Sequence, residues 1–301
     1  MTDDAPRDEL VVHVPARLDA VVQRARPSLS RRLVRQMFVE GAVRVNGRPA
    51  PKGRRVLPGD RVSLPVVPPL APEPALDLPV VWEDAYVVAV EKPGGMPSHA
   101  LDPRQRGTAA AFILARWPET ADVGEPLAAG LVHRLDTGTS GLLLAARTPA
   151  AWDALRTAFR ARRVTKRYLA VVAGEPPAET TVRLALAHEP GARGRMRAAR
   201  AGERSWPATT HLRCLALLPH GRALVEAEIR TGVTHQVRAH CAALGCPVVG
   251  DAVYGGPAAP PLGAGRHALH AADLVVDAAL WPTPLRLHSP LPADLRALCS
   301  A

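Results

Sequence analysis

Proline is so dense between residues 65 and 79 that this stretch can form neither a helix nor a central strand. Each proline fixes its own φ angle and lacks the N–H group that helices and sheets use. The prolines of this stretch are Pro65, Pro68, Pro69, Pro72, Pro74 and Pro79. Such a segment is semi-rigid and extended. We therefore predict an N-terminal module at residues 9–66, a Pro-rich linker at 67–79 and a C-terminal module at 80–301.

The N-terminal module shows two helical patterns, at residues 16–25 and 28–41. Ser30 is a suitable N-cap for the second helix, and Gly41 is a suitable residue to end it. The apolar residues of this helix share one face, which leaves its arginines on the outer face. These arginines are Arg31, Arg32 and Arg35.

Two turn signals follow these helices. Asn46-Gly47 stands between alternating apolar and polar residues and predicts a β-hairpin. Pro58-Gly59 precedes a further strand pattern, RVSL. Together these patterns predict a small α/β module with clustered arginines.

The charge of the chain favours a nucleic-acid partner. Lys and Arg number 38 against 28 Asp and Glu, which gives a formal net charge of +10. An excess of positive charge is the electrostatic footprint of proteins that bind RNA or DNA, although a merely basic enzyme remains an alternative. No apolar run reaches 18 residues, so we expect no membrane span.

The cysteines and the start of the chain bear on its compartment. Cys214, Cys241, Cys246 and Cys299 form no CxxC pair, and the first ten residues are acidic and polar. We therefore expect reduced thiols, no secretory signal and a cytoplasmic location.

The C-terminal module mixes strands and helices irregularly. Strand patterns occur at 78–93, 164–174 and the start of 222–245, and helical patterns occur at 107–117, 150–163 and the end of 222–245. The basic stretch 188–204 has the composition of a loop or a hairpin tip. Strands that follow strands predict an α+β fold with a mixed, largely antiparallel sheet and flanking helices, not a doubly wound one.

The segment His133–Gly141 carries the clearest candidate chemistry, and three interpretations compete. Asp-Thr-Gly-Thr-Ser is typical of aspartic proteases, but that chemistry needs two carboxylates and the chain holds one such motif. Ser140 does not stand in the GxSxG spacing of a hydrolase nucleophile. The third interpretation is a lone catalytic carboxylate, Asp136, in an RNA-binding site.

Five sequence blocks carry a resemblance to a known family. HRLDTGTSGLLLAA resembles the HRLDxxTSGLLLxA signature of RNA pseudouridine synthases of the RluA type, which act on large-subunit ribosomal RNA. The blocks EDAYVVAVEKPGGMPSH, VTKRYLAVVAG, TGVTHQVRAHCAALGCPVVGDAVYGG and RHALHAADLVV resemble further motifs of that family, in its order. SRRLVRQMFVEGAVRVNGRP and VLPGDRV resemble the small RNA-binding module first seen in ribosomal protein S-four. The resemblance covers residues 9 to 300.

The resemblance implies a catalytic site without metal or cofactor. Asp136 would attack a uridine at carbon 6 of the base or carbon 1′ of the ribose. A uridine within an RNA helix must first be extruded, because no side chain can reach it there. Arg238 would pair with the carboxylate, and Tyr168 would stack on the uracil or assist removal of the carbon 5 proton. A guanidinium can hold a carboxylate through two parallel bonds.

The resemblance also implies RNA-binding residues around this centre. Arg134 would fill the gap that the extruded nucleotide leaves, and Leu269 would form an apolar wall. The remaining residues expected to support or bind RNA are His133, Lys166, Arg31, Arg32 and Arg35. We expect Thr137, Thr139 and Ser140 to brace the turn through local backbone bonds.

The family usually has Arg where this chain has Val233, and we expect that arginine to support the RNA or the loop and not to perform chemistry. A catalytically silent RNA-binding protein is the rival interpretation, and transfer RNA is an alternative substrate. We expect a monomer. His235, His240, Cys241 and Cys246 match no usual zinc spacing. The arginines of the basic stretch extend the RNA surface or are merely solvated.

Overall fold

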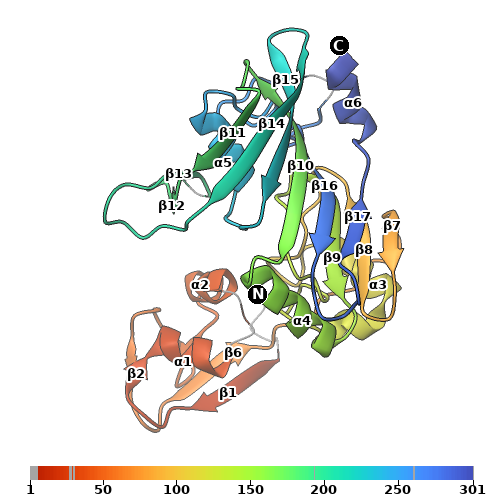
Figure 1. The fold of residues 1–301 in the computed structure, drawn as a ribbon. Coiled ribbons are helices and arrows are strands. Elements are labelled where there is room, and N and C mark those ends of the chain that lie inside the picture. Colours follow the sequence, from red (N-terminus) through yellow and green to blue (C-terminus); the bar gives the residue numbers. More distant parts are fainter. Residues whose placement is uncertain (1–5, 27–28, 30, 193, 260–261, 301) are drawn as a thin grey trace.

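The computed structural model describes residues 6–26, 29, 31–192, 194–259 and 262–300, and for Arg31 and Arg32 the backbone alone. It consists of two modules joined by the linker (Figure 1). The expected cap Ser30 lies outside the described residues. No described helix is long and apolar enough to cross a bilayer.

The N-terminal module packs two helices, α1 (Leu18–Ala25) and α2 (Arg31–Val39), on a small antiparallel sheet. That sheet has the order β1-β6-β3-β4, and β2 pairs separately with β5. The bounds are β1 Arg7–Val11, β2 Ala16–Arg17, β3 Arg44–Val45, β4 Arg48–Pro49, β5 Arg55–Val56 and β6 Arg61–Pro65. The hairpin predicted at Asn46-Gly47 is confirmed, with φ of 52° and 79° at these two residues.

The linker packs against the C-terminal module instead of spanning solvent. Leu70 and Leu78 are buried in the same apolar cluster as the helix α3 (Ala109–Arg116). Glu73 holds the linker to that helix, because its backbone N–H donates to the Ala111 carbonyl and its carboxylate accepts from the Gly107 N–H at 2.7 Å. The prolines keep the segment extended, and its leucines anchor it.

One sheet of nine described strands forms the centre of the C-terminal module, in the order β11-β14-β15-β10-β16-β9-β8-β7 with β17 also beside β16. A separate short hairpin, β12–β13, projects from it (Figure 1). The bounds are β7 Val80–Glu83, β8 Val87–Lys92, β9 Ser140–Ala146, β10 Val164–Ala173, β11 Glu179–Arg183, β12 Leu186–His188, β13 Met196–Ala198, β14 Thr209–Leu218, β15 Arg222–Ile229, β16 Leu269–Val276 and β17 Leu285–His288. Among the described strands, β9 and β16 form the single parallel pair. The predicted α+β class with a largely antiparallel sheet is therefore confirmed.

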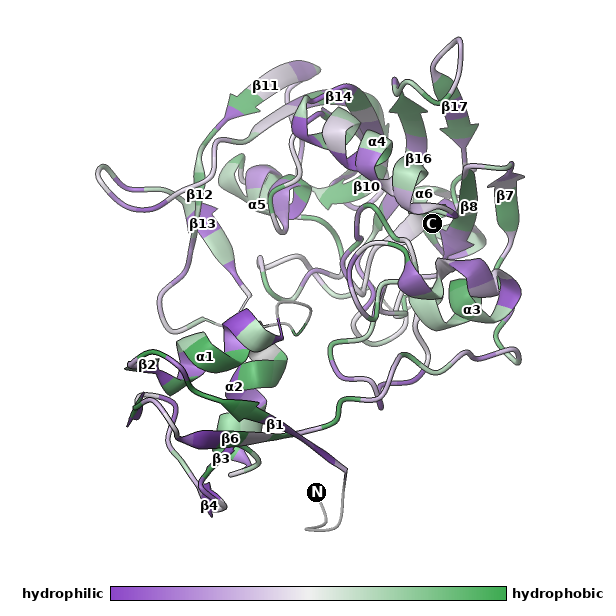
Figure 2. Ribbon diagram, turned by 90° about the horizontal axis from the view of Figure 1, so that it is seen from below, coloured by the Kyte–Doolittle hydropathy of each residue, from purple (hydrophilic) through white to green (hydrophobic). Residues whose placement is uncertain are grey.

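Helices cover both faces of the sheet near β9. Leu143 packs into the cluster that contains α3, whereas Leu142 and Leu144 pack with α4 (Pro149–Arg160). Every residue of β9 is consequently buried, and β16 is hydrophobic over most of its length (Figure 2). The remaining helical elements are η1 Pro118–Asp122, α5 Gln236–Ala243 and α6 Ala293–Ser300.

Gly141 is the point at which the segment after Asp136 enters the sheet. Its φ is 112°, and a Cβ atom there would lie 2.3 Å from the Ala271 carbonyl oxygen on β16. The parallel pairing of β9 with β16 therefore depends on a residue without a side chain.

We predict that Gly141→Ala lowers the free energy of unfolding by about 3 kcal/mol, because it adds backbone strain and a clash with β16. Gly191→Ala is the matched control, since Gly191 also has a positive φ of 77° but its Cβ would meet nothing within 4 Å. We expect that control to cost about 1 kcal/mol. Urea unfolding of the three proteins measures both, and equal losses would refute the close approach as the cause.

Candidate active site

A cavity of about 540 Å³ lies where the loop before β9 meets β10, the end of α4 and the start of α5. The structure brings together every site residue expected from the C-terminal module. These residues are His133, Arg134, Asp136, Lys166, Tyr168, Arg238 and Leu269. Of the three arginines expected on α2, Arg35 does not line this cavity. Arg35 is exposed on that helix, and the side chains of Arg31 and Arg32 lie outside the described atoms.

Asp136 is joined to a buried guanidinium. Arg238 Nη1 donates to Asp136 Oδ2 at 2.8 Å, while Arg238 Nε and Nη2 donate to the two carboxylate oxygens of Asp251 at 2.6 and 2.8 Å. Burial opposes the charged form of Asp251, but the bonds from Arg238 keep the pKa of its carboxyl below the usual range. Asp251 thereby fixes the orientation of the Arg238 guanidinium, so that Nη1 points toward Asp136.

The start of α5 holds Arg238 in this orientation. Gln236, the first residue of the helix, donates from Nε2 to the Thr209 carbonyl at 2.9 Å and accepts at Oε1 from the Thr231 hydroxyl at 2.8 Å. The Arg238 guanidinium also lies 5.3 Å from the centre of the Tyr254 ring. Burial lowers the pKa of Arg238, but the two carboxylates outweigh it and raise that pKa. The guanidinium is therefore a permanent positive charge beside Asp136.

The turn that carries Asp136 is held by buried cations. Lys92 is fully buried, and its Nζ donates to the carbonyls of Pro93, Met96 and Thr137. Burial lowers the pKa of Lys92 to about 7. Arg266 Nη1 donates to the Gly138 carbonyl at 2.7 Å from the other side. The turn is consequently fixed at both Thr137 and Gly138.

The expectation that Thr139 and Ser140 form local backbone bonds is wrong for their side chains. The Thr139 hydroxyl is bonded to His267 Nε2 at 2.8 Å, and the Ser140 hydroxyl to His270 Nδ1 at 2.9 Å. Both histidines lie more than a hundred positions along the chain, His270 within β16 and His267 two residues before it. The parallel pairing of β9 with β16 brings these partners together, and this pairing is not visible in the local sequence.

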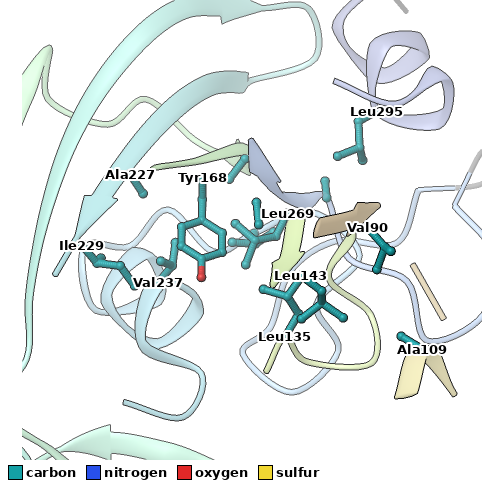
Figure 3. Packing of buried hydrophobic residues seen from close by; sticks show 14 of the residues in the cluster. Val90, Ala109, Leu135, Leu143, Tyr168, Ala227, Ile229, Val237, Leu269 and Leu295 are labelled. Carbon is teal, nitrogen blue, oxygen red and sulfur yellow. The ribbon is translucent and has the colours of Figure 1, made fainter. Parts of the chain in front are cut away.

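Tyr168 and Lys166 share one face of β10, two positions apart. Figure 3 shows the Tyr168 ring beside Val237 of α5 and Leu269 of β16. Burial, with the charge of Asp136, raises the pKa of the Tyr168 hydroxyl well above its usual range. Lys166 donates to the Thr231 carbonyl at 2.7 Å, and burial lowers its pKa to about 8.

His133 supports the loop before the turn, and Arg134 beside it is exposed at the mouth of the cavity. The Leu144 N–H donates to His133 Nε2 at 3.1 Å, and the imidazole stacks on Phe159 with ring centres 5.4 Å apart. Burial lowers the pKa of His133 to about 3, so the ring is neutral at pH 7. These contacts tie the loop to β9 and α4.

The described lining of the cavity is strongly cationic, with one carboxylate, that of Asp136. Its arginines and lysine are Arg134, Arg156, Arg160, Arg162, Lys166, Arg230 and Arg238. Such a lining attracts polyanions such as RNA and repels cationic ligands.

The histidines of the zinc alternative are bonded to other groups, and its cysteines are free thiols. His240 bonds through Nδ1 to the Thr210 hydroxyl at 2.8 Å and through Nε2 to the Leu184 carbonyl at 3.1 Å. Cys241 and Cys246 are buried free thiols, and burial raises the pKa of Cys241 to about 12. Within the described part of the chain, no cluster of metal-ligating side chains is found. Val233 packs in a small apolar cluster instead of projecting a charge.

The basic stretch 188–204 contains the last residue of β12, the tip of the β12–β13 hairpin, β13 and the segment that follows it. Its Arg197 donates to the Glu203 carboxylate at 2.8 Å, and Arg195 lies 5.8 Å from the centre of the Tyr254 ring. The Met196 N–H donates to the Tyr254 hydroxyl, which also contacts His235 Nδ1. One face of the hairpin is thereby joined to the wall of the cavity.

Sequence reasoning gave no role to Asp251, Lys92, Arg266 or Tyr254. A signal for each was present, because all four lie in the blocks that carried the family resemblance. Their partners, however, lie far away in the sequence, so the chemistry of each residue emerges only from the fold.

Comparison with known proteins gives two family matches. Residues 86–243 match the RNA pseudouridylate synthase family, and residues 16–62 match the S4 domain. A protein of Chloroflexus aurantiacus described as an uncharacterized RNA pseudouridine synthase is 38% identical, with 96% of this chain and 92% of that protein covered. Ribosomal large subunit pseudouridine synthase D of Neisseria meningitidis is 33% identical, with 94% and 78% covered.

A solved structure has a similar fold. Human RNA pseudouridylate synthase domain containing 1 superposes with a TM-score of 0.61 at 28% identity. The superposition covers 77% of this chain and 91% of the human one.

We predict that Asp251→Asn lowers the free energy of unfolding at pH 7 by about 3 kcal/mol, because it removes one partner of a buried ion pair. The pKa of Asp251 is lowered in the folded protein, so its contribution is present above the unfolded pKa and is lost as the pH falls through the folded one. The difference in free energy of unfolding between wild type and variant should therefore become smaller in acid.

Urea unfolding at several pH values measures this difference. The control is Asp102→Asn, which breaks a surface pair with Arg104 and should cost at most about 1 kcal/mol. A difference in free energy of unfolding that stays the same at every pH tested would contradict the prediction.

Proposed function

The chain belongs to the RNA pseudouridine synthase family and is an isomerase of that family, and on this premise we propose that it converts specific uridines of large-subunit ribosomal RNA to pseudouridine with Asp136 as the nucleophile. The observation that carries this proposal is the carboxylate of Asp136 held by Arg238 in a cavity of otherwise cationic lining. The relatives named ribosomal large subunit pseudouridine synthase D support ribosomal RNA as the substrate. Transfer RNA stays an alternative substrate, and a monomer stays a prediction.

The bonding of Asp136 suits a nucleophile. Oδ2 receives the bond from Arg238, and His235 Nε2 lies 3.8 Å from the same oxygen. Among the described residues, Oδ1 receives no hydrogen bond. A carboxylate that is anchored through one oxygen can attack with the other without losing its orientation.

The proposed reaction begins when a uridine leaves its helix and enters the cavity. Asp136 Oδ1 bonds either to carbon 6 of uracil or to carbon 1′ of the ribose, and the bond between N1 and carbon 1′ breaks. The uracil then rotates, and carbon 5 bonds to carbon 1′. Loss of the carbon 5 proton and release of Asp136 give pseudouridine, with N1 protonated. Both forms of attack use the same carboxylate.

The remaining walls of the cavity would hold the base. Tyr168 and Leu269 offer an aromatic and an aliphatic surface to the uracil ring, and Lys166 lies at the same face of β10. The raised pKa of Tyr168 keeps its hydroxyl protonated, so in the resting enzyme it is a donor and not a base. Arg134, exposed at the mouth, is placed to occupy the space of the extruded nucleotide.

We predict that Asp136→Asn lowers the rate of tritium release from RNA labelled at carbon 5 of uridine by at least about 10³-fold, because an amide is not a nucleophile here. The substrate is unmodified large-subunit ribosomal RNA. Asp153→Asn, on the exposed face of α4, is the control and should keep the wild-type rate. Salt-sensitive RNA binding without release by the wild type would favour the silent RNA-binding protein instead.

We predict that Tyr168→Phe lowers kcat by about 10²-fold with KM changed less than about threefold, because the ring remains while the proton-carrying hydroxyl is lost. The initial rate of tritium release over multiple turnovers gives kcat, and its dependence on RNA concentration gives KM. Tyr86→Phe, at an exposed tyrosine, should leave both unchanged. An unchanged kcat for Tyr168→Phe would leave stacking as the sole role of this residue.

A further inference from the structure

Three arginines at the mouth of the cavity have no part in the mechanism above. Arg160 is the last residue of α4, Arg162 follows two positions later, and Arg230 comes directly after β15. All three are exposed and line the cavity. Within the described chain, no hydrogen bond or ion pair satisfies their guanidinium groups.

The inner cations of the same cavity differ, because each has a partner in the protein. Arg156 donates to the Val132 carbonyl, Lys166 to the Thr231 carbonyl, and Arg238 to two carboxylates. The positive charge at the mouth is not balanced in this way. Like charges that gather without an acidic neighbour repel one another, so their arrangement favours an external anion.

The strand register shows that these arginines lie at one end of the sheet. On β10 and β15, Lys166 pairs with Ile229, so Arg230 follows at the end where β10 begins. Arg162 stands two residues before the first residue of β10. Adjacent strands are about 4.8 Å apart, and arginine side chains are longer than that spacing. The guanidinium groups can therefore reach neighbouring phosphates of a single RNA strand.

Arg162 has an unfavourable backbone conformation for its residue type. Its φ is 57°, and α4 ends with bonds from Arg162 N–H to the Phe159 carbonyl and from Arg163 N–H to the Ala158 carbonyl. This ending places a left-handed residue just after the helix, where glycine is the usual choice. A side chain costs stability there, so its presence points to a role outside the fold.

We propose that Arg160, Arg162 and Arg230 form a phosphodiester-binding cluster that holds the RNA backbone next to the uridine in the cavity. The proposal rests on the proposed function in that the RNA strand must enter this cavity. A guanidinium can bond to two phosphate oxygens at once. The cluster gives the enzyme a hold on the strand that is independent of base identity.

The test is Arg162→Gly, because it separates binding from folding. The unfolding midpoint should stay the same or rise by a few degrees, since glycine adopts the left-handed conformation without strain. Binding to a short fluorescein-labelled oligouridylate, followed by fluorescence anisotropy, should weaken about tenfold at low salt. The slope of log affinity against log salt concentration should fall by about 0.7 for each arginine removed.

Arg160→Ala is the second variant, because its exposed side chain makes no bond that the fold needs. Two controls match the two features of Arg162, which are its positive charge and its left-handed backbone conformation. Arg163→Ala removes an adjacent exposed charge outside the cavity lining, and His220→Gly relieves a left-handed residue, with φ of 60°, in the β14–β15 turn. Neither control should change the salt slope.

A smaller slope for both Arg162→Gly and Arg160→Ala, with the unfolding midpoint kept, supports the cluster. An unchanged salt slope in both variants overturns the cluster. A smaller salt slope in Arg162→Gly alone, together with a lower unfolding midpoint of that variant, also overturns it. If the wild type releases no tritium from ribosomal RNA, the proposed function fails. The salt slopes for oligouridylate binding then still test whether the three arginines bind phosphodiesters, because that measurement needs no catalysis.

Discussion

The rest of the site depends on the guanidinium of Arg238, which is buried between two carboxylates. A buried charge without partners is costly, and a planar guanidinium can bond to two carboxylates in fixed directions. Asp251 takes Nε and Nη2, and Asp136 takes Nη1. Because Asp136 precedes β9 and Arg238 belongs to α5, this chain of charges also fixes the distance between the two elements. A lysine could not replace the arginine, since its ammonium has no such fork.

The turn around Asp136 is fixed by a second group of buried polar side chains. Lys92 and Arg266 donate to carbonyls of the turn, and the Thr139 hydroxyl is bonded to His267. Burial lowers the pKa of His267 to about 3, so this partner stays neutral at pH 7. Each of these groups would be destabilising alone, but bonded to their partners they hold Asp136, the nucleophile that we propose, in one orientation. Preorganisation of this kind avoids the cost of reorienting the site during the reaction.

The sequence predicted features whose cause is local. The hairpin at Asn46-Gly47 follows from two residues that tolerate a positive φ. The helical patterns at 107–117 and 150–163 correspond to α3 and α4, although α4 ends at Arg160, three residues before the end of its pattern. Asp136, Tyr168 and Arg238 were grouped because each lies in a recognisable block, and the fold places them around one cavity.

Long-range partners could not be predicted in the same way. The bonds of Thr139 and Ser140 depend on the parallel pairing of β9 with β16, and nothing near the turn specifies that pairing. Asp251 stands thirteen positions from Arg238 and shares no helix or strand with it, so its role also required the tertiary structure.

The size of the cavity bears on how such an enzyme selects its target. A volume of about 540 Å³ accommodates a nucleotide and not a segment of folded RNA, and uridine occurs throughout every RNA. A cavity that receives one base does not distinguish one uridine from another. That choice requires contacts beyond the mouth. The N-terminal module and the β12–β13 hairpin lie on the same side of the molecule in both ribbon views (Figures 1 and 2). Surfaces on one side can bind one structured RNA together, so selection of the site would depend on its shape while the cavity acts on a single base.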